Sequence, residues 1–257
     1  MSAATRRAEY LEALGIDCWM PRAGGQRAQE PLPQAPQAPS VPAGLAPPTA
    51  YSREAAADAD APAWERLREE VRACTRCALH ETRTQAVFGV GNPHAEWMVI
   101  GEAPGAEEDR RGEPFVGRAG QLLDAMLRAL GLSRGTNVYI ANILKSRPPG
   151  NRDPRPQEVA ACLPYLHRQI ALVRPRLLLA VGRIAAQNLL QTDAPLGRLR
   201  GQVHRFGERN VPLVVTYHPA YLLRSPADKR KAWEDLKFAR SVFARTANPE
   251  ANDGHRS

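Results

Sequence analysis

The sequence lacks several features that would place it in common protein classes. It has four cysteines in 257 residues, and its opening stretch "MSAATRRAEY" contains no apolar leader. Four cysteines are too few for a disulfide scaffold, so we expect a protein of the reducing cytosol rather than a secreted one. The most apolar run, "RLLLAVG", is far too short to cross a bilayer. We therefore expect no membrane association.

Acidic residues do not balance the basic ones, and the formal net charge is +8. Residues 1–64 carry a net charge of −2, whereas the rest of the chain carries +10. Such a basic surface favours a polyanion, and nucleic acid is the first candidate. Many basic proteins bind no nucleic acid, so charge alone does not decide the partner.

Proline is concentrated in one stretch, because seven of the 23 prolines fall in "PLPQAPQAPSVPAGLAPP". A packed core cannot form from this composition. We predict four segments: a short amphipathic helix within 1–22, a disordered linker over 23–63, a folded domain over 64–246 and a disordered tail over 247–257.

The predicted N-terminal helix has Tyr10, Leu11 and Leu14 on one face. Two interpretations remain open. The helix is either a docking peptide for a protein partner or a segment that folds back on its own domain.

From Trp64 onward, strand patterns alternate with helix patterns. The predicted strands lie in "EWMVIGE", "NVYIANIL", "RLLLAVG" and the end of "GQVHRFGERNVPLVVTYHP". This alternation predicts an α/β fold with a mostly parallel sheet covered on both faces by helices. In such sheets the functional site lies at the carboxyl ends of the strands.

Unusual residues follow the predicted strands. Glu102 follows the first strand, Asn142 ends the second, His218 follows the last, and Phe115 lies in the first loop. Glycine and proline in these loops are explained by turn formation alone. The convergence of the four other side chains on one edge is not, and it predicts a site there.

Three segments resemble the signature segments of a known family: "GEAPGAEEDRRGEPFVGRAGQLLD", "ANILKSRPPGNRDP" and "HPAYLL". The chain is similar over 65–245 to the uracil-DNA glycosylase superfamily, most closely to its family 4, the iron–sulfur enzymes of bacteria and archaea. The resemblance implies a three-layer α/β/α sandwich around a four-stranded, mostly parallel sheet. It also implies a monomeric enzyme that flips uracil out of DNA and hydrolyses its N-glycosidic bond, leaving an abasic site. The alternatives are a glycosylase for another deaminated base and a non-catalytic protein that binds DNA or recruits a partner.

The resemblance assigns base binding to Ala103, Phe115 and Asn142. A carboxamide offers one donor and one acceptor, which match the N3–H and O4 of uracil, so Asn142 suits that edge. Phe115 would stack on the flipped base, although an ordinary core aromatic is the simpler interpretation. Lys145 is near in sequence, but a strand-cleaving Schiff base is not expected.

Two residues are expected to act on the bond. Cleavage leaves negative charge on uracil, so a donor at its O2 is needed, and His218 can supply it. Glu102 would position or activate the attacking water. The neighbouring carboxylates Glu107, Glu108 and Asp109 are alternatives for that role, or they cap the next turn.

Contacts to DNA are expected from the loops around the pocket. Arg147 and Arg152 would contact the backbone, Leu222 would wedge into the gap left by the flipped base, and Arg224 would contact a phosphate.

The family resemblance also implies a 4Fe–4S cluster held by four cysteines. Three of the four positions are occupied here by Cys74, Cys77 and Cys162, but Ser146 stands at the fourth. We expect a cluster that is retained but weakened, with a structural role.

Other interpretations of the cysteines stay open. Ser146 could ligate as an alkoxide, or three cysteines could hold the cluster alone. Cys18 could supply the fourth ligand, zinc could bind with His80 as its fourth ligand, or the cluster could be lost.

Overall fold

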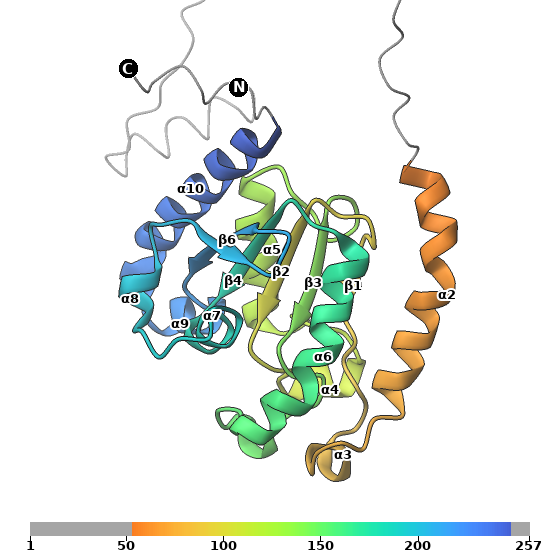
Figure 1. The fold of residues 1–257 in the computed structure, drawn as a ribbon. Coiled ribbons are helices and arrows are strands. Elements are labelled where there is room, and N and C mark those ends of the chain that lie inside the picture. Colours follow the sequence, from red (N-terminus) through yellow and green to blue (C-terminus); the bar gives the residue numbers. More distant parts are fainter. Residues whose placement is uncertain (1–52, 248–257) are drawn as a thin grey trace, which may run out of the picture. The chain divides into compact units, whose positions relative to one another are not determined.

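A computed structural model describes residues 53–247 (Figure 1). The predicted N-terminal helix, Cys18 and all but the first residue of the predicted tail lie outside the described residues. Helix α2 spans Arg53–Arg72, so the prediction that the linker extends to residue 63 is wrong from Arg53 onward. The stretch "REAAADADA" is rich in alanine, which has the highest helix propensity, and this explains the earlier helix start.

The centre of the fold is a six-stranded sheet in the order β1-β3-β2-β4-β6-β5. The four inner strands are parallel to one another, as predicted, and all their residues except Val211 at the start of β6 are buried. The prediction of four strands omitted two short antiparallel strands, one at each edge. The strands are β1 (Val90–Gly91), β2 (Trp97–Gly101), β3 (Val138–Asn142), β4 (Leu177–Val181), β5 (His204–Phe206) and β6 (Val211–Thr216).

Helices cover both faces of the sheet, which confirms the three-layer α/β/α architecture (Figure 1). One core joins α2, α6 and α7 to one face of the sheet. The other core joins α5 and α10 to the opposite face. Strand residues alternate between the two cores, as the period of a β-strand requires. The long helices are α5 (Arg118–Ala129), α6 (Pro156–Val173), α7 (Arg183–Leu190) and α10 (Lys229–Ala247).

Short helices form the loops at the strand ends. They are α3 (Leu79–Thr82), α4 (Ala106–Arg111), α8 (Leu196–Leu199) and α9 (Pro219–Arg224), with 3-10 turns at Pro149–Asn151 and Pro226–Asp228. The 3-10 turn Pro226–Asp228 directly precedes α10. None of the described helices is both long and apolar enough to span a lipid bilayer.

Candidate active site

A cavity of about 440 Å³ lies at the edge of the sheet where the parallel strands β2, β3 and β6 end. Its volume falls in the range of pockets that hold small ligands. The structure brings together at this cavity Glu102, Ala103, Phe115, Asn142, Arg152, His218 and Arg224. These residues come from five separate loops and strand ends, so the sheet edge gathers them as the sequence pattern predicted.

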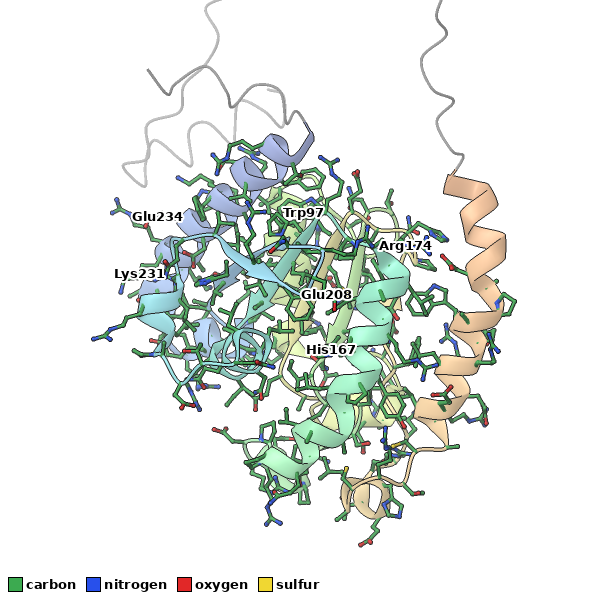
Figure 2. All side chains as sticks on the ribbon, in the orientation of Figure 1. Trp97, His167, Arg174, Glu208, Lys231 and Glu234 are labelled. Carbon is green, nitrogen blue, oxygen red and sulfur yellow. The ribbon has the colours of Figure 1, made fainter. Side chains whose placement is uncertain are left out.

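A larger cavity, of about 650 Å³, lies between α6, the end of α7 and the β5–β6 turn. Figure 2 labels His167, Arg174 and Glu208 around it. None of the predicted site residues lines this cavity. We therefore place the site at the smaller one, where the candidate acids, bases and amide meet.

Asn142 ends β3 with its carboxamide at the cavity wall. Its Oδ1 is buried and has no hydrogen-bond partner within the described part of the chain. A buried acceptor without a donor is costly, so this atom is suited to a ligand N–H.

Gly101, the last residue of β2, makes room for this arrangement. A Cβ at Gly101 would lie 2.4 Å from Asn142 Oδ1 and 2.6 Å from a ring carbon of Phe115. No real side chain tolerates such distances, so only glycine lets the amide and the ring reach the cavity. Phe115 itself is buried and has a positive φ of 54°. The left-handed backbone of Phe115 is uncommon outside glycine and marks a loop held in a special shape.

His218 lies two residues after the end of β6 and caps helix α9. The backbone N–H of Ala220 donates to its Nδ1 at 3.1 Å. Burial lowers the pKa of His218 to about 4, and the Arg224 cation acts in the same direction. A neutral imidazole whose Nδ1 accepts must carry its proton on Nε2. His218 is therefore a neutral donor, and its ring lies 5.6 Å from that of Phe115 between centroids.

Glu102 follows β2 and is the acidic group with the largest pKa displacement at the cavity. Burial raises the pKa of Glu102 to about 7, the Asp153 carboxylate adds to the rise, and the Arg183 cation opposes it. Arg183 itself pairs with Asp153 at 2.9 Å. A carboxyl group that titrates near neutral pH is suited to general base catalysis.

The neighbouring carboxylates are engaged in the loop. Glu108 lines the cavity, but its oxygens accept three backbone N–H groups on both sides of helix α4. Asp109 accepts the N–H of Thr84 with both oxygens, at 3.0 Å. Glu107 pairs with an arginine of its own helix. Of the four carboxylates considered, Glu108 caps α4 and Glu107 and Asp109 are engaged elsewhere, which leaves Glu102 as the candidate to meet water.

The predicted DNA-contacting arginines differ in how they are held. The guanidinium of Arg152 binds both oxygens of Glu158, at 2.9 and 2.5 Å, so it is fixed to the start of α6. Arg147 donates to Asn151 at 2.7 Å and does not line the cavity. Arg224 is exposed at the cavity rim, which leaves its charge accessible.

The prediction that Leu222 wedges into DNA is wrong for this structure. Leu222 is only 1% exposed, because it points from the short helix α9 into the protein. The exposed apolar side chains of α9 are Tyr221, at 37%, and Leu223, at 36%. Tyr221 also lines the cavity and stacks on Tyr217.

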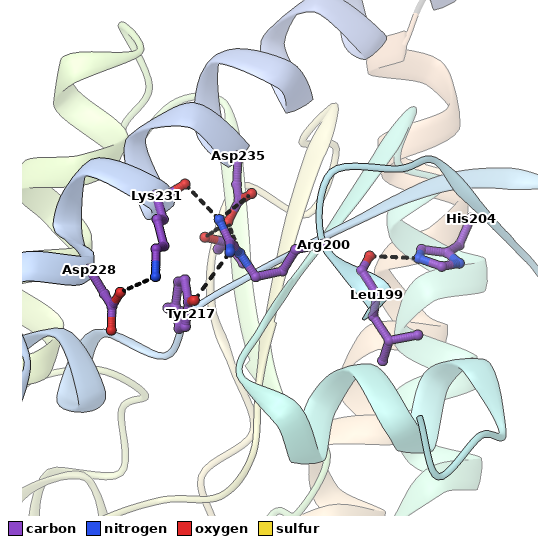
Figure 3. Close-up of polar contacts among 8 residues, drawn as sticks. Leu199, Arg200, His204, Tyr217, Asp228, Lys231 and Asp235 are labelled. Carbon is purple, nitrogen blue, oxygen red and sulfur yellow. Dashed lines mark hydrogen bonds and ion pairs between the residues drawn. The ribbon is translucent and has the colours of Figure 1, made fainter. Parts of the chain in front are cut away.

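A buried ion pair anchors the strand end that carries His218. Arg200 bonds both oxygens of Asp235, at 2.7 and 2.9 Å, and donates to the hydroxyl of Tyr217 at 3.1 Å (Figure 3). The Thr216 hydroxyl also donates to Asp235, at 2.8 Å. Thr216 and Tyr217 immediately precede His218, so the pair links β6 to α10 next to the site.

Three cysteines lie in one neighbourhood beside the core. Cys162 is buried on α6, and Cys74 and Cys77 pack against the same core from the segment after α2. Burial raises the pKa of the Cys162 thiol, and the other two thiols are near enough to add to the rise. Three soft sulfur donors suit an iron–sulfur group in chemical type.

The fourth position differs in its chemistry. Ser146 is buried, and its Oγ accepts from Arg83 at 2.9 Å. His80, the alternative fourth ligand, bonds through Nδ1 to the Cys77 carbonyl. Over residues 53–247, no group of three or more His, Cys, Asp or Glu side chains forms a ready metal site. The donor set therefore fits an iron–sulfur cluster at three positions and not at the fourth.

Sequence reasoning considered Gly182, in "VGR", for phosphate binding but missed how it shapes the site beside His218. Gly182 has a φ of 97°, and a Cβ there would lie 2.9 Å from the Cβ of His218. The pair of Asp153 and Arg183 beside Glu102 was also missed. A glycine directly after a buried strand was the available signal for Gly182, but no sequence pattern predicted that pair.

The fold and the cavity define an α/β protein that can hold a flat, hydrogen-bonding ring between an aromatic side chain, an amide and a neutral histidine. The family model of the uracil DNA glycosylase superfamily matches residues 88–237. The chain therefore belongs to the uracil-DNA glycosylase superfamily.

Individual relatives agree with that membership. The type-4 uracil-DNA glycosylase of Archaeoglobus fulgidus is 46% identical over 175 residues, which cover 65% of this chain and 87% of that protein. The type-4 enzyme of Thermotoga maritima is 41% identical over 183 residues, covering 70% and 94%. A type-5 uracil-DNA glycosylase of Thermus thermophilus is 35% identical over 172 residues, covering 61% and 75%.

Proposed function

We propose that this protein removes uracil from DNA by hydrolysing the N-glycosidic bond and leaves an abasic site for repair. The unpaired, buried Oδ1 of Asn142 is the observation that carries the proposal. The N3–H of uracil supplies the missing donor, and the amide N–H₂ can meet uracil O4. Cytosine presents an acceptor at N3 and a donor at N4, so both contacts would fail. The superfamily membership and the type-4 relatives support the same substrate.

The remaining residues explain how the bond breaks. A stacked base cannot reach the cavity, so the nucleotide must be flipped out of the helix. Phe115 then offers its ring to the base. As the bond lengthens, negative charge collects on uracil O2, and the Nε2–H of His218 stabilises it. Ala103 lies at the wall and adds shape rather than charge.

Glu102 completes the reaction at the sugar. In its ionised form it accepts a proton from the attacking water and favours the positive charge that develops on the sugar. The amine of Lys145 donates to Asn142 O and Gln169 Oε1 inside the protein, and Lys145 does not line the cavity. A Schiff base with the sugar is therefore not part of the proposal, and the product is an intact strand with an abasic site.

Basic groups at the rim would hold the DNA. Arg224 is proposed to contact a phosphate, and Arg147, which directly precedes Pro148 at the cavity, is proposed to contact the DNA backbone. Leu223 takes the place of Leu222 as the proposed wedge, because its side chain is exposed.

Cys74, Cys77 and Cys162 are proposed to hold an iron–sulfur cluster. When bound, the cluster would tie the segment after α2 to α6, and glycosidic hydrolysis needs no electron transfer from it. We expect protein purified without oxygen to contain iron and acid-labile sulfide. Cys162→Ser should lose most of both, as measured by metal analysis and visible absorption. A wild-type protein free of iron and sulfide would rule out this part of the proposal.

An oligonucleotide with a single uracil tests the main proposal. The labelled strand is incubated with the full chain and then treated with alkali, which breaks abasic sites. Breakage at the uracil position only after alkali is the expected result. Breakage before alkali would contradict hydrolysis without strand cleavage.

Two controls sharpen this test. An oligonucleotide with cytosine at the same position should remain intact, because cytosine presents an acceptor to Asn142 Oδ1 and a donor to its amide N–H₂. The variant Asn142→Ala should lower uracil excision by about 100-fold, on the order of the loss of one preorganised contact to the transition state. Unchanged excision by this variant would contradict the site assignment.

A further inference from the structure

Lys145 is a buried, ionisable side chain that the proposed reaction does not use. The residue is 2% exposed and is the largest fully buried side chain among the described residues. Burying an amine costs free energy unless it is hydrogen-bonded. An apolar side chain would fill this space at lower cost, so the amine calls for a specific reason.

The contacts of the amine point to that reason. Lys145 Nζ donates to the main-chain carbonyl of Asn142 at 2.9 Å and to Gln169 Oε1 at 2.6 Å. Gln169 is fully buried on α6, and its own Nε2 donates to the carbonyl of Phe88 at 2.8 Å. The amine therefore connects the end of β3 to a fixed point in the core.

Asn142 lies where the sheet ends and the loop begins. Its neighbour in the parallel ladder is Gly101, and the N–H of Ile143 donates to the Gly101 carbonyl at 2.9 Å. The peptide group after Asn142 is thus held by β2 through its N–H and by Lys145 through its carbonyl. Rotation of that peptide would turn the Asn142 Cα and, with it, the carboxamide at the cavity.

We infer that Lys145 is a positioning residue for base recognition, because its buried amine holds the Asn142 main chain and thereby aims the carboxamide at the base. The inference rests on the proposed function. Lys145 does not line the cavity, so it acts through Asn142 rather than on the substrate. A displacement of a reacting or recognising group by about 1 Å costs roughly 100-fold in rate.

A double-mutant cycle tests the inference. Single-turnover rates of uracil excision are measured with excess enzyme for the wild type, Lys145→Met, Asn142→Ala and the double variant. Methionine keeps the length and the apolar packing but removes the donor. We expect Lys145→Met to lower the rate by roughly 10- to 100-fold in the wild-type background. In the Asn142→Ala background the same change should cost less than about twofold, because the group that Lys145 aims is already gone.

A general loss of structure would give a different pattern. In that case the rate reductions of the two substitutions would multiply. Lys145→Met would then lower the excision rate by the same factor in the Asn142→Ala background as in the wild type. That result would overturn the inference. A wild-type chain that excises no uracil would instead contradict the proposed function, so the two failures are distinguishable.

Gln169→Leu is the matched control in the same buried network. It removes the second partner of the amine but leaves the contact to the Asn142 carbonyl. We expect its excision rate to fall less than that of Lys145→Met, because the amine keeps its direct contact to the Asn142 carbonyl. A loss equal to that of Lys145→Met would overturn the inference. If Lys145→Met fails to fold, Lys145→Gln, whose shorter side chain cannot reach the same carbonyl, enters the same cycle.

Discussion

Two ionisable side chains at the cavity are displaced from their ordinary pKa values in opposite directions. Burial raises the pKa of Glu102 to about 7 and lowers that of His218 to about 4. The two displacements have one physical origin, because burial disfavours whichever form is charged. At neutral pH this leaves a neutral imidazole donor beside a carboxyl group that is close to half ionised. Separated pKa values of this kind are a common sign of an acid–base site.

The pH dependence of excision should follow Glu102. Its carboxylate is the active form, so the rate should be half-maximal near pH 7 and fall about tenfold per unit below pH 6. His218 stays neutral over that range and should add no step above about pH 5. Single-turnover rates from pH 4.5 to 9 measure this profile. Glu102→Gln should lower the maximal rate at high pH and remove the decrease in rate toward low pH. A wild-type rate that decreases only near pH 4.5 would contradict the assignment of Glu102.

The stability of the same variant should depend on pH in the opposite sense. Unfolding lowers the Glu102 pKa from about 7 to its ordinary value, so the folded state binds more protons between those values. The free energy of unfolding that protonated Glu102 contributes is therefore lost as the pH rises toward 7. Glu102→Gln should raise the melting temperature at pH 8, and less at pH 5. An equal change at both pH values in thermal unfolding would show that ionisation is not the cause.

At the scale of secondary structure, the site depends on how firmly each strand end is held. The end of β6 is fastened by the Arg200–Asp235 ion pair, whose side chains are 14% and 4% exposed. Figure 3 shows that Arg200 also reaches Tyr217 and the carbonyl of Lys231. Removing one member leaves an unpaired buried charge, which costs more than the pair itself contributes.

Asp235→Ala should therefore lower the free energy of unfolding by about 3–5 kcal/mol. The measurement is equilibrium unfolding in urea followed by circular dichroism. Arg230→Ala on the same helix is the control, since its pair with Glu234 is exposed and its midpoint should hardly move. An unchanged urea midpoint for Asp235→Ala would show that the ion pair does not stabilise the end of β6.

How far sequence predicted these elements depends on the length of the pattern. The inner strands and α6 were predicted because buried runs and long apolar stripes are strong signals. Strand β1 has only two residues and no period, so it was missed. Leu222 was assigned to the wrong face because a helix of six residues has too few turns to show which side is buried. Capping was named as an alternative for three carboxylates, but only the loop shape in the structure selects Glu108 among them.

At the scale of the whole molecule, the positive charge and the functional residues lie in the same part of the chain. Every residue assigned to the site lies in the unit of residues 53–247 that the structure describes. The family match lies there too, at residues 88–237. The net +10 charge of residues 65–257 gives that unit the means to attract DNA without its N-terminal extension.

A chain that begins at Pro48 should therefore keep uracil excision within about threefold of the full-length rate, a change of the size expected away from a site. Its binding to uracil-free DNA should weaken steeply with salt, as phosphate contacts release counterions. Single-turnover excision and fluorescence anisotropy at several salt concentrations measure both. A large loss of excision would assign residues 1–47 a part in catalysis.

Gly101 has a consequence for how the base preference of this protein can change over evolutionary time. A methyl group there would collide with both the amide and the ring that meet the base. Every single-codon change at this position therefore damages the pocket before it can reshape it. Altered specificity must arise through Phe115, Asn142 or the loops around them. The absence of a side chain at Gly101 therefore limits which substitutions can change the base preference of this pocket.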